Sequence, residues 1–468
     1  MAETTYDVAL IGSGPGGYVA AIRAGQLGLK TVVVERDNKL GGTCLHVGCI
    51  PTKALLFDAE LYDRFQNSKE FGIETKGFSV DWAAVLARKS KVVTKLSKGI
   101  EFLFRKNKVE WIRGFGRIAG PGRVSVTDDK NQQREIQAKN IVVATGSEAK
   151  MLPGLQADGK FILTNKEILE LKSVPKSMVI IGAGAVGVEF ASIFHRFGSQ
   201  VTILEMLPHA VPLEDEEISA ELEKAFKKQG IALHLGAKVE KVAKTATGVT
   251  VDWQSADGQP QKLQAETCLV AVGRSPNTQN IGLERTRAQL ERGFVKVNEY
   301  MQTAEPNVYA IGDIVAGSPL LAHVGSAEGL VAVTHIAGKA TEPINYNQIP
   351  NCTYTEPEVA SVGLTERKAR GAGHKVRVGK FPFAGNSKAA ILGDQEGFIK
   401  IVSDERYGEI LGVHMIGPRV TELIAEAVLA MRLEGTVEDL ERAIHPHPTL
   451  TEAVSEAAHA VHGMAIHI

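Results

Sequence analysis

Cysteine, net charge and long apolar segments are all scarce in this sequence. Its 468 residues include only four cysteines, and its formal net charge is −1 at pH 7. So few cysteines argue against a secreted scaffold held by disulfides and favour a reducing cytoplasm. Balanced charge provides no field that would hold nucleic acid or a membrane surface. The chain is too long for a single hydrophobic core, so about two to four domains are expected.

Signals for export or membrane insertion are also missing. The first residues lead directly into a short apolar strand, without the basic and apolar regions of a signal or transit peptide. The most apolar stretch, Met178 to Phe194, contains three glycines and Glu189. This composition favours a strand, a turn and a helix over a membrane span. We therefore expect a cytoplasmic protein that contacts neither membrane nor nucleic acid.

Two of the four cysteines lie close together, with four residues between Cys44 and Cys49. Five residues of ideal helix rise about 7.5 Å, whereas the Cα atoms of a disulfide are rarely more than ~7 Å apart. A bond between these cysteines therefore requires a distorted segment, and Gly48 allows one. Strained, accessible disulfides are the reducible ones that serve in catalysis.

The cysteine pair has two other interpretations: two unrelated buried thiols, or half of a metal site. A zinc site needs two further ligands at suitable spacing, but Cys268 and Cys352 stand alone. We therefore expect no metal. The position of the pair favours a redox disulfide, because its segment starts at Gly41, six residues after a dinucleotide-binding pattern ends at Glu35.

That dinucleotide-binding pattern occurs twice, with its two copies 170 positions apart. In each copy an apolar strand leads into three glycines, a helix that a fourth glycine ends, and a second strand that ends in an acid. The three glycines permit a tight turn, close approach to a pyrophosphate, and packing of helix on strand. The acid binds a ribose hydroxyl. The residues are Gly12, Gly14, Gly17, Gly28 and Glu35 in the first copy, and Gly182, Gly184, Gly187, Gly198 and Glu205 in the second.

The two sites need not hold the same molecule. Because the cysteine pair follows the first site closely, that site is expected to hold FAD, which accepts electrons from a dithiol and passes hydride to a nicotinamide. The second site is expected to hold a pyridine nucleotide. Glu205 accepts hydrogen bonds from a free ribose 2′-hydroxyl and would repel a 2′-phosphate, so the prediction is NAD rather than NADP.

The remaining segments complete an α/β fold with two Rossmann-like domains. Short strands over 109–140 and a meander over 236–267 each precede a closing strand, and from about residue 346 strands and two helices carry no nucleotide pattern. The acidic run Glu214–Glu217 is expected to be a solvated helix start. The predicted domains are 1–147 for FAD, 148–275 for NAD, 276–345 completing the FAD domain, and an α+β domain over 346–468.

Titratable groups concentrate near the C-terminus, from His445 to Glu452. A dithiol must lose a proton before it attacks a disulfide, because the thiolate is the nucleophile. An imidazole such as that of His447 is the natural base near neutral pH, and a carboxylate would orient it. The alternative is a structural or solvated histidine. Thr449 or Thr451 is expected to cap the helix that begins near Glu452.

Together these motifs resemble those of the dihydrolipoamide dehydrogenases, within the FAD-dependent pyridine nucleotide–disulfide oxidoreductase family. The resemblance extends from Val8 to about Glu456. Its most specific parts are Gly-Gly-Thr-Cys-x4-Cys-Ile-Pro-x-Lys, Ala-Thr-Gly, Ala-Ile-Gly-Asp and His-x-His-Pro-Thr-x-x-Glu. It implies an enzyme that oxidises protein-bound dihydrolipoamide to lipoamide and passes two electrons through a Cys44–Cys49 disulfide and FAD to NAD.

The resemblance implies a role for each residue of the expected reaction. Cys49 would lie against the flavin, and Cys44 would form the mixed disulfide with the substrate. His447 would be the base, with Glu452 as its orienting partner. The family is homodimeric, with His447 supplied to the disulfide of the other subunit, and the segment from about residue 346 would form the dimer interface.

The resemblance also adds cofactor contacts to those of the glycine motifs. Lys53 would lie near the reactive nitrogen of the flavin and pair with Glu189, Asp313 would bind the ribityl chain, and Glu35 the adenosine ribose. The other positions that match cofactor contacts are Gly116, Thr145, Gly146 and Ala322 for FAD, and Val239 and Gly273 for NAD. At His46 the family more often has Asn, and we expect a partly exposed polar contact there rather than a second base.

The implied partners are the lipoyl domains and subunit-binding region of a dihydrolipoamide acyltransferase in a 2-oxo acid dehydrogenase complex, or the lipoyl carrier of glycine cleavage. Glutathione-type reductases share the fold and the cysteines but usually use NADP, which Glu205 disfavours. Mercuric reductases and large thioredoxin reductases add C-terminal cysteines that this sequence lacks. A transhydrogenase or NADH oxidase would not need both cysteines together with His447. A non-catalytic assembly subunit would not need the complete set of chemical residues.

Overall fold

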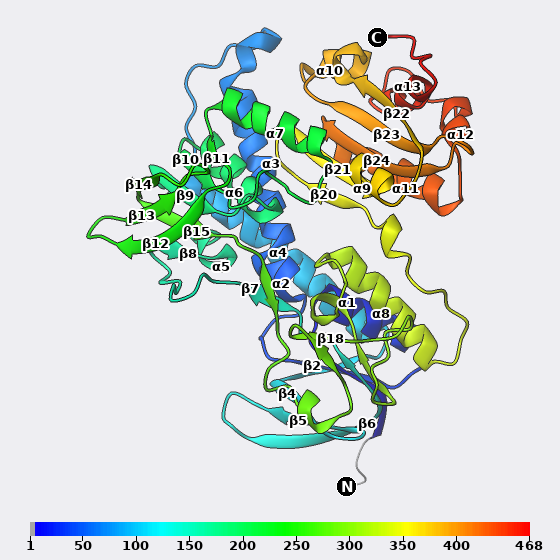
Figure 1. Cartoon of the computed structure of the whole chain (residues 1–468). Coiled ribbons are helices and arrows are strands. Elements are labelled where there is room, and N and C mark those ends of the chain that lie inside the picture. The colour runs from blue at the N-terminus through cyan, green and yellow to red at the C-terminus, as the bar shows by residue number, and fades with distance from the viewer. Residues whose placement is uncertain (1–4) are drawn as a thin grey trace. The chain divides into compact units, whose positions relative to one another are not determined.

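The computed structural model describes residues 5–468, which form two compact units (Figure 1). The first unit contains the described residues up to Ala54, together with Asp81–Lys150 and Arg274–Ile344. The second unit contains Leu55–Val80, Met151–Gly273 and Asn345–Ile468. Each unit therefore collects segments that are distant in the sequence, and helix α3 (Cys49–Gln66) contributes residues to both.

The sheet of the first unit consists of β1 (Thr5–Ile11), β2 (Thr31–Glu35), β3 (Glu110–Arg113), β4 (Phe115–Gly120), β5 (Arg123–Thr127), β6 (Gln133–Val143) and β19 (Val308–Ala310). Strands β3, β2, β1 and β6 lie side by side in this order with parallel pairing, and β19 also pairs parallel with β6. The first half of β6 pairs antiparallel with β5, and β5 pairs with β4.

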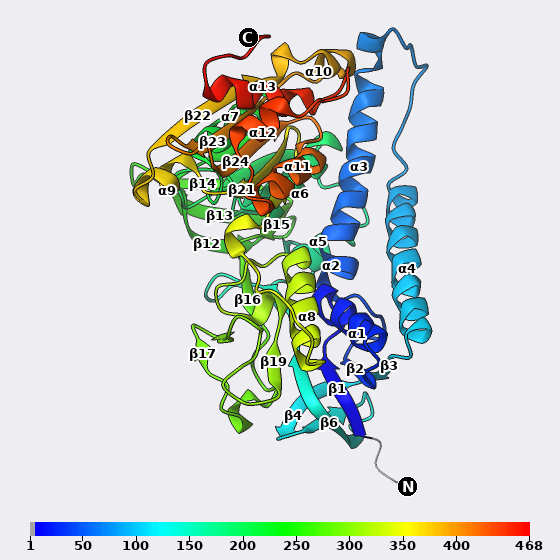
Figure 2. The ribbon, with the colours of Figure 1, turned by 90° about the vertical axis from the view of Figure 1, so that its right-hand side faces the viewer.

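Alternate residues of β1 face two different cores, because side chains of a strand point to opposite faces. Val8 and Leu10 pack toward helices, while Ala9 and Ile11 pack toward β4 and β5. The helices are α1 (Pro15–Gln26), α2 (Gly42–Val47), α4 (Trp82–Lys106) and α8 (Ala322–Ile336). In Figure 2 α1 and α8 lie side by side, and a Cβ added to Gly16 would be 2.9 Å from the Gly325 oxygen.

The second unit contains another parallel sheet, formed by β8 (Ile162–Leu163), β9 (Ser177–Ile181), β10 (Gln200–Leu204), β11 (Ala232–His234) and β15 (Thr267–Val270). The order is β11-β10-β9-β15-β8. The apolar stretch from Met178 to Phe194 is β9 followed by α6 (Ala185–Arg196), as predicted. An antiparallel meander of β12 (Lys238–Lys244), β13 (Val249–Gln254) and β14 (Pro260–Ala265) precedes β15.

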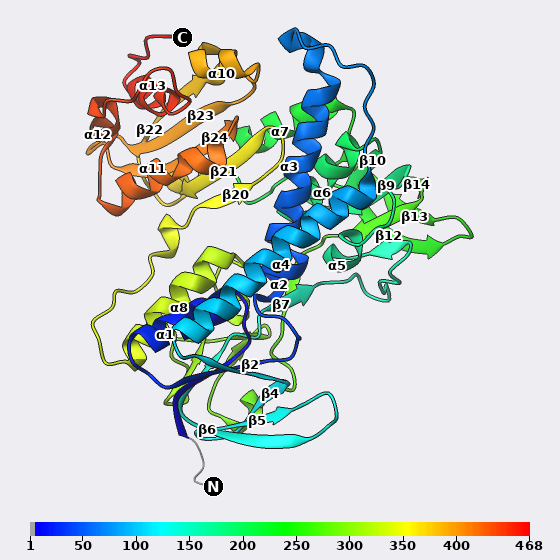
Figure 3. The same cartoon turned by 180° about the vertical axis from the view of Figure 1, so that it is seen from behind.

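The segment from Asn345 onward forms an antiparallel sheet with five α-helices, where the sequence predicts two. The strand order is β20 (Asn351–Thr353), β21 (Glu358–Gly363), β24 (Ile410–Gly417), β23 (Phe398–Asp404) and β22 (Val376–Pro382). The helices are α9 (Glu366–Gly371), α10 (Ser387–Leu392), α11 (Val420–Arg432), α12 (Val437–Arg442) and α13 (Glu452–Val461). Figure 3 shows α11 lying along this sheet, and one apolar cluster joins the sheet to α11, α12 and α13.

The prediction of a solvated acidic run at Glu214–Glu217 is wrong for its first two residues, which are buried. Asp215 is the N-cap of α7 (Glu216–Gln229), and its carboxylate lies 2.9 Å from the Nζ of Lys400, a side chain only 2% exposed. Ile399 and Ile401 face the apolar cluster, so strand alternation turns Lys400 to the other face of the sheet. A buried charge needs a partner of opposite charge. Because 185 positions separate Asp215 and Lys400, the sequence alone does not reveal that they are partners.

The predicted α/β class, with two Rossmann-like parts and a C-terminal α+β part, is confirmed. The elements not yet named are short. None of the helices described for residues 5–468 combines the length and apolar character needed to cross a membrane. The short elements are β7 (Ser147–Ala149), β16 (Arg274–Pro276), β17 (Leu290–Glu291), β18 (Phe294–Val295), α5 (Asn165–Ile168), and the 3-10 turns η1 (Ser68–Phe71), η2 (Leu283–Arg285), η3 (Gly312–Ile314), η4 (Tyr346–Gln348) and η5 (Phe383–Gly385).

Candidate active site

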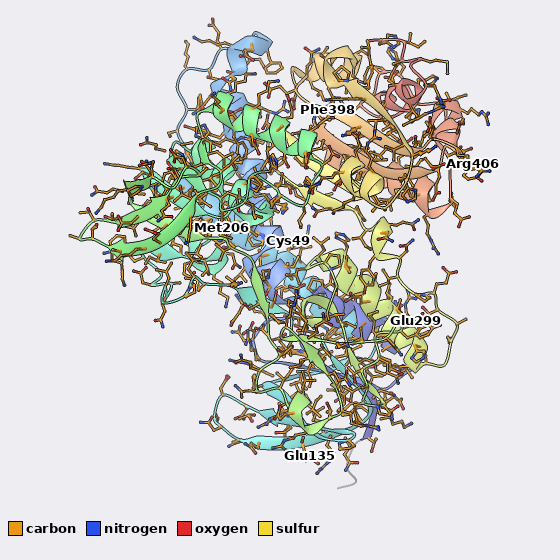
Figure 4. The ribbon with its side chains drawn as sticks, viewed as in Figure 1. Cys49, Glu135, Met206, Glu299, Phe398 and Arg406 are labelled. Carbon is orange, nitrogen blue, oxygen red and sulfur yellow. The ribbon has the colours of Figure 1, made fainter. Side chains whose placement is uncertain are left out.

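The two neighbouring cysteines lie on successive helices. Cys44 is in α2, Cys49 is the first residue of α3, and Gly48 between them leaves the helical path with φ −145° and ψ −121°. A Cβ on Gly48 would lie 3.0 Å from the Thr43 oxygen and 3.3 Å from Cys44 Cα. The chain therefore folds back closely on Cys44 because residue 48 is glycine. Figure 4 labels Cys49 at the start of α3.

The two cysteines are thiols without a disulfide between them, and they contact each other. The hydrogen bond with Cys49, followed by burial, raises the pKa of the Cys44 thiol. The positive charge of Lys53 acts in the opposite direction, and Lys53 lies about one helical turn after Cys49 on α3. In the dithiol, Cys44 therefore keeps its proton at neutral pH, and forming its thiolate requires a base.

His46, between the cysteines, contacts the backbone of a preceding loop. Its Nε2 lies 2.8 Å from the Leu40 oxygen, which also accepts a hydrogen bond from the Ser97 hydroxyl of α4 at 3.0 Å. The ring is half-buried. This is the kind of polar contact that we expect of His46, and it ties the cysteine segment to the body of the first unit.

The first glycine motif closes around Glu35, which is 7% exposed. Its Oε2 accepts hydrogen bonds from the backbone nitrogen of Ser13 at 2.9 Å and from the Ser13 hydroxyl at 2.7 Å, and its Oε1 accepts one from Asp37 N at 2.9 Å. Gly12 has φ +108°, and a Cβ there would lie 2.3 Å from the Ala144 oxygen. The turn between β1 and α1 is therefore open only to glycine at this position.

The second glycine motif repeats this arrangement around Glu205, which is 8% exposed. Its Oε2 accepts a hydrogen bond from Ala183 N at 2.6 Å, and its Oε1 accepts one from Leu207 N at 2.8 Å. Gly182 has φ +105°, and a Cβ there would lie 2.4 Å from the Ala271 oxygen. The acid of each motif thus fixes the turn after the first strand as well as offering its remaining lone pairs to a ligand.

The other two glycines of each motif differ in how much space surrounds them. A Cβ on Gly17 or Gly187 would lie 2.1 Å or 2.0 Å from the oxygen of the first glycine of its motif. A Cβ on Gly14 or Gly184 would meet nothing within 4 Å, and each of these residues caps a helix, α1 or α6. Both helix N-termini are therefore open, and their N–H groups suit a pyrophosphate. The described residues fit two dinucleotides, as FAD and NAD require.

Asp313 belongs to a polar cluster that the sequence analysis did not identify. The Ser147 hydroxyl donates a short hydrogen bond to Asp313, and Arg274 donates from Nε to the Ser147 hydroxyl and from Nη2 to the Ser147 carbonyl oxygen, each at 2.6 Å. Arg274 Nε also lies 3.7 Å from the Asp313 carboxylate. The cluster fixes the side chain expected to bind the ribityl chain. Its only sequence signal is an arginine directly after Gly273.

A buried carboxylate supports the turn that carries Asp313. Glu328 of α8 is fully buried, and its Oε2 accepts a hydrogen bond from Gly312 N at 2.5 Å. A buried carboxylate without partners would be costly. An acid on the apolar helix 322–336 was therefore a usable signal that the sequence analysis passed over.

The other expected FAD positions also lie in the first unit. Thr145 and Gly146 form the turn after β6, where the Thr145 hydroxyl donates to the Asn277 oxygen at 2.7 Å. Gly116 lies in β4, and a Cβ on it would be 2.9 Å from the Val34 side chain. Ala322 begins α8. All four expected positions thus lie in the unit that carries the first glycine motif.

The expected NAD positions lie in the second unit. Glu189 is on α6, is 4% exposed, and accepts a hydrogen bond from Tyr354 N at 3.0 Å. Gly273 follows β15 with φ +111°, and Val239 lies in β12, half-buried. Because Lys53 belongs to the first unit and Glu189 to the second, the expected ion pair between them stays a prediction.

His447 and Glu452 contact each other, as the C-terminal motif predicts. His447 Nδ1 lies 2.9 Å from Glu452 Oε1, and the histidine side chain is 70% exposed. Burial alone would raise the pKa of Glu452, but hydrogen bonds from Thr449 N and His447 lower it below its ordinary value. The carboxylate is therefore charged at neutral pH and holds the ring by Nδ1, leaving Nε2 as the nitrogen free to take up a proton.

The predicted threonine cap of α13 is wrong. Thr451 is the N-cap residue but makes no side-chain cap, because its hydroxyl donates instead to Glu426 Oε2 at 2.6 Å. The Thr449 hydroxyl donates to the Pro446 oxygen at 2.6 Å. Among residues 5–468, no group of three or more His, Cys, Asp or Glu is placed to hold a metal.

Comparisons with known families extend over almost the whole chain. Residues 6–329 match the model of the pyridine nucleotide-disulphide oxidoreductases, and residues 349–458 match the dimerisation domain of the same group. A solved structure, LpdA from Mycobacterium tuberculosis, superimposes with a TM-score of 0.89 at 28% sequence identity, covering 97% of this chain and 99% of that one.

Several curated proteins are similar over their full length. A dihydrolipoyl dehydrogenase from Bacillus subtilis is 48% identical, with 99% of each chain covered. Dihydrolipoyl dehydrogenase 3 of Pseudomonas putida is 45% identical, covering 99% of this chain and all of the relative. The mitochondrial dihydrolipoyl dehydrogenase of Pisum sativum is 41% identical and is covered over 92% of its length.

Proposed function

Because the chain belongs to the pyridine nucleotide-disulphide oxidoreductase family, we propose that it oxidises protein-bound dihydrolipoamide to lipoamide and passes two electrons through Cys44, Cys49 and FAD to NAD. One observation carries this proposal. The segment that bears the cysteines adjoins the first glycine motif: Gly41 N donates to the Ser13 hydroxyl at 3.2 Å, and a Cβ on Gly42 would lie 2.6 Å from Gly14 Cα. A dithiol and a dinucleotide site are thereby held by neighbouring residues.

The proposed reaction begins with proton transfer to His447 from one thiol of the substrate. The resulting thiolate attacks the sulfur of Cys44 in the Cys44–Cys49 disulfide, whose S–S bond breaks as Cys49 leaves as a thiolate. The second substrate thiol then displaces Cys44, and its proton passes to the departing Cys44 sulfur. This closes the disulfide of lipoamide and leaves both cysteines reduced. FAD, when bound, supplies the two-electron chemistry that links this dithiol to hydride transfer onto NAD. Because lipoamide leaves before NAD accepts the electrons, the scheme predicts ping-pong kinetics.

The expected roles of the site residues are part of this proposal. Cys44 exchanges with substrate, Cys49 faces the flavin, and Lys53 lies near the reactive flavin nitrogen with Glu189 as its partner. The geometry of Glu452 on His447 Nδ1 supports His447 as the base, because the carboxylate orients the ring through that nitrogen. The remaining proposed contacts are Gly12, Gly14, Gly17, Glu35, Gly116, Thr145, Gly146, Asp313 and Ala322 for FAD, and Gly182, Gly184, Gly187, Glu205, Val239 and Gly273 for NAD.

The proposed assembly is a homodimer in which His447 serves the cysteines of the other subunit. The dimerisation domain over 349–458 contains both His447 and Glu452 and supports this arrangement. The names of the relatives support a lipoyl group as substrate. We propose that it arrives on the lipoyl domain of a dihydrolipoamide acyltransferase, or of the glycine cleavage carrier, in the cytoplasm.

The test is anaerobic titration of the purified protein with dihydrolipoamide and then NAD, followed in the visible spectrum. We expect a long-wavelength charge-transfer band that bleaches as NADH forms. Cys49→Ser should lose this band, and turnover should fall by at least about 10⁴-fold. A flavin that stays oxidised with dihydrolipoamide, yet is reduced by NADH, would reject the substrate and direct the search to glutathione and other disulfides.

A further inference from the structure

A second histidine–glutamate pair lies beside the proposed base. His445 Nε2 is 2.7 Å from Glu426 Oε1, and its Nδ1 is 3.0 Å from the Ala443 oxygen. The His445 side chain is 8% exposed, whereas that of His447 is 70% exposed. The two histidines are thus alike in chemistry but not in environment, and both ring nitrogens of the buried one are engaged by acceptors of its own chain.

Glu426 holds both ends of the loop that carries His447. Its Oε1 contacts His445 at the start of the loop, and its Oε2 accepts the hydrogen bond of the Thr451 hydroxyl, at 2.6 Å, at the end. The carboxylate comes from α11, which packs on the sheet in the apolar cluster shared with α13. One side chain on a well-packed helix therefore fixes the span of a loop between residues 445 and 451.

The contacts of His445 require a particular protonation state. Both ring nitrogens face acceptors, a carboxylate and a carbonyl oxygen, and only the imidazolium donates from both nitrogens at once. The hydrogen bond with Glu426 raises the pKa of His445, more than burial lowers it. The charged groups that face His445 are Glu426 of α11 and Glu452 of α13, and both are acids that favour its protonated form.

We propose that the His445–Glu426 pair is a positioning device, which holds the loop 443–451 so that His447 stays aligned to take a proton from the substrate dithiol. This inference rests on the proposed function. His445 touches no reacting atom in this scheme and acts only through His447. Alignment errors of about 1 Å cost up to roughly 100-fold in rate, so a loop held at both ends matters for an exposed base.

The test separates the two half-reactions of the holoenzyme by stopped-flow absorbance. Glu426→Gln and His445→Gln should slow flavin reduction by dihydrolipoamide by about 10- to 100-fold, with little change in KM. Flavin reduction by NADH, which does not use His447, should stay within about twofold in both variants. The matched controls are Glu422→Gln, at an exposed position of the same helix, and His374→Gln, at an exposed histidine; neither should change either half-reaction.

A pH profile provides a readout that a general structural defect would not move. His445 keeps both donated bonds below its raised pKa and loses one as pH rises through it. The dithiol half-reaction of the wild type should therefore have an alkaline limb, and in Glu426→Gln this limb should move to lower pH. The double variant His445→Gln/Glu426→Gln should be no slower than the worse single variant, because both changes break the same His445–Glu426 contact.

The outcomes distinguish this inference from the proposed function. Equal dithiol rates in Glu426→Gln and Glu422→Gln, or an unmoved alkaline limb, would overturn the positioning role while leaving the substrate intact. A wild type that dihydrolipoamide does not reduce would overturn both. Should Glu426→Gln fail to fold, Thr451→Val removes the other bond of the same carboxylate, and a normal dithiol rate in that variant and in His445→Gln rejects the proposal.

Discussion

The two glycine motifs have nearly the same local structure in two different units. Their first glycines have φ +108° and +105°, and in both an added Cβ would overlap a backbone oxygen, at 2.3 Å and 2.4 Å. Glu35 and Glu205 each accept the N–H of the residue after that glycine. Each also accepts an N–H two residues beyond itself. Such repetition is expected if both motifs bind a dinucleotide, which is a need that two different reactants share.

The difference between the motifs lies in what adjoins them. In the first, Ser13 adds a hydroxyl bond to Glu35 and accepts a hydrogen bond from Gly41, at the start of the cysteine segment. In the second, Ala183 occupies the same place and has no hydroxyl. The first motif thus adjoins the proposed redox pair. This contrast is why we assign the flavin to the first site and NAD to the second.

The largest expected effects come from the first glycine of each motif. Gly12→Ala and Gly182→Ala force a side chain into a positive φ and against a carbonyl, which should cost about 3 kcal/mol locally and weaken the ligand by about 100-fold. Gly12→Ala should yield protein with little bound flavin. Gly182→Ala should remain yellow but lose reduction by NADH. Flavin absorbance per protein and stopped-flow reduction by NADH measure the two losses.

Gly28→Ala and Gly198→Ala are matched controls for these changes. Both residues have positive φ, +81° and +101°, but an added Cβ would meet nothing within 4 Å. They should cost only about 1 kcal/mol of stability and keep both ligands. Loss of flavin from Gly182→Ala, or its full retention in Gly12→Ala, would show that the two sites are assigned the wrong way round.

A smaller effect is expected from the acid of the second motif. Glu205→Arg replaces a carboxylate with a cation that favours a 2′-phosphate, so the ratio of kcat/KM for NAD to that for NADP should fall by about 100-fold or more. The variant also loses the bonds from Ala183 and Leu207. Glu205→Gln controls for that loss, and it should weaken NAD without a comparable gain for NADP. An unchanged ratio in Glu205→Arg would remove the argument that Glu205 selects NAD.

The parts of this molecule that could be predicted from sequence are those in which cause and effect are close along the chain. Strand, glycine turn, helix and acid are encoded within about 30 residues, and both copies are found in the structure where they were expected. The family, the enzyme class and the cofactor pair FAD and NAD are confirmed at the level of the family by the comparisons. The domain boundaries stay a prediction.

The parts that could not be predicted depend on residues brought together by folding. Lys400 neutralises Asp215 across 185 positions, and Arg274 meets Ser147 across 127. Local rules gave wrong results where such partners compete: the Thr451 hydroxyl bonds to Glu426 instead of capping its own helix. Local propensity describes which backbone group a side chain bonds when no distant residue competes. In these places a residue distant in the sequence supplies the hydrogen-bond or charge partner instead.

The smallest expected effect tests the hydroxyl that distinguishes the two motifs. Ser13→Ala makes the first motif like the second and removes two hydrogen bonds, those with Glu35 and Gly41. We expect a loss of about 1 kcal/mol, seen as a lower denaturant midpoint with unchanged slope, and a few-fold weaker hold on the flavin. The reverse change, Ala183→Ser, places a hydroxyl beside Glu205 and should leave stability within about 1 kcal/mol.

If Ser13→Ala slows dithiol reduction of the flavin more than it weakens flavin binding, the hydroxyl acts through Gly41 on the cysteine segment. If it weakens flavin binding alone, its role is confined to Glu35. An unchanged protein would leave the link between the first motif and the cysteine segment to the backbone, through the hydrogen bond from Gly41 N to the Ser13 carbonyl oxygen at 3.1 Å and the close contact of Gly42 with Gly14. Gly42→Ala, with a Cβ 2.6 Å from that backbone, would then be the change that separates the two motifs in function.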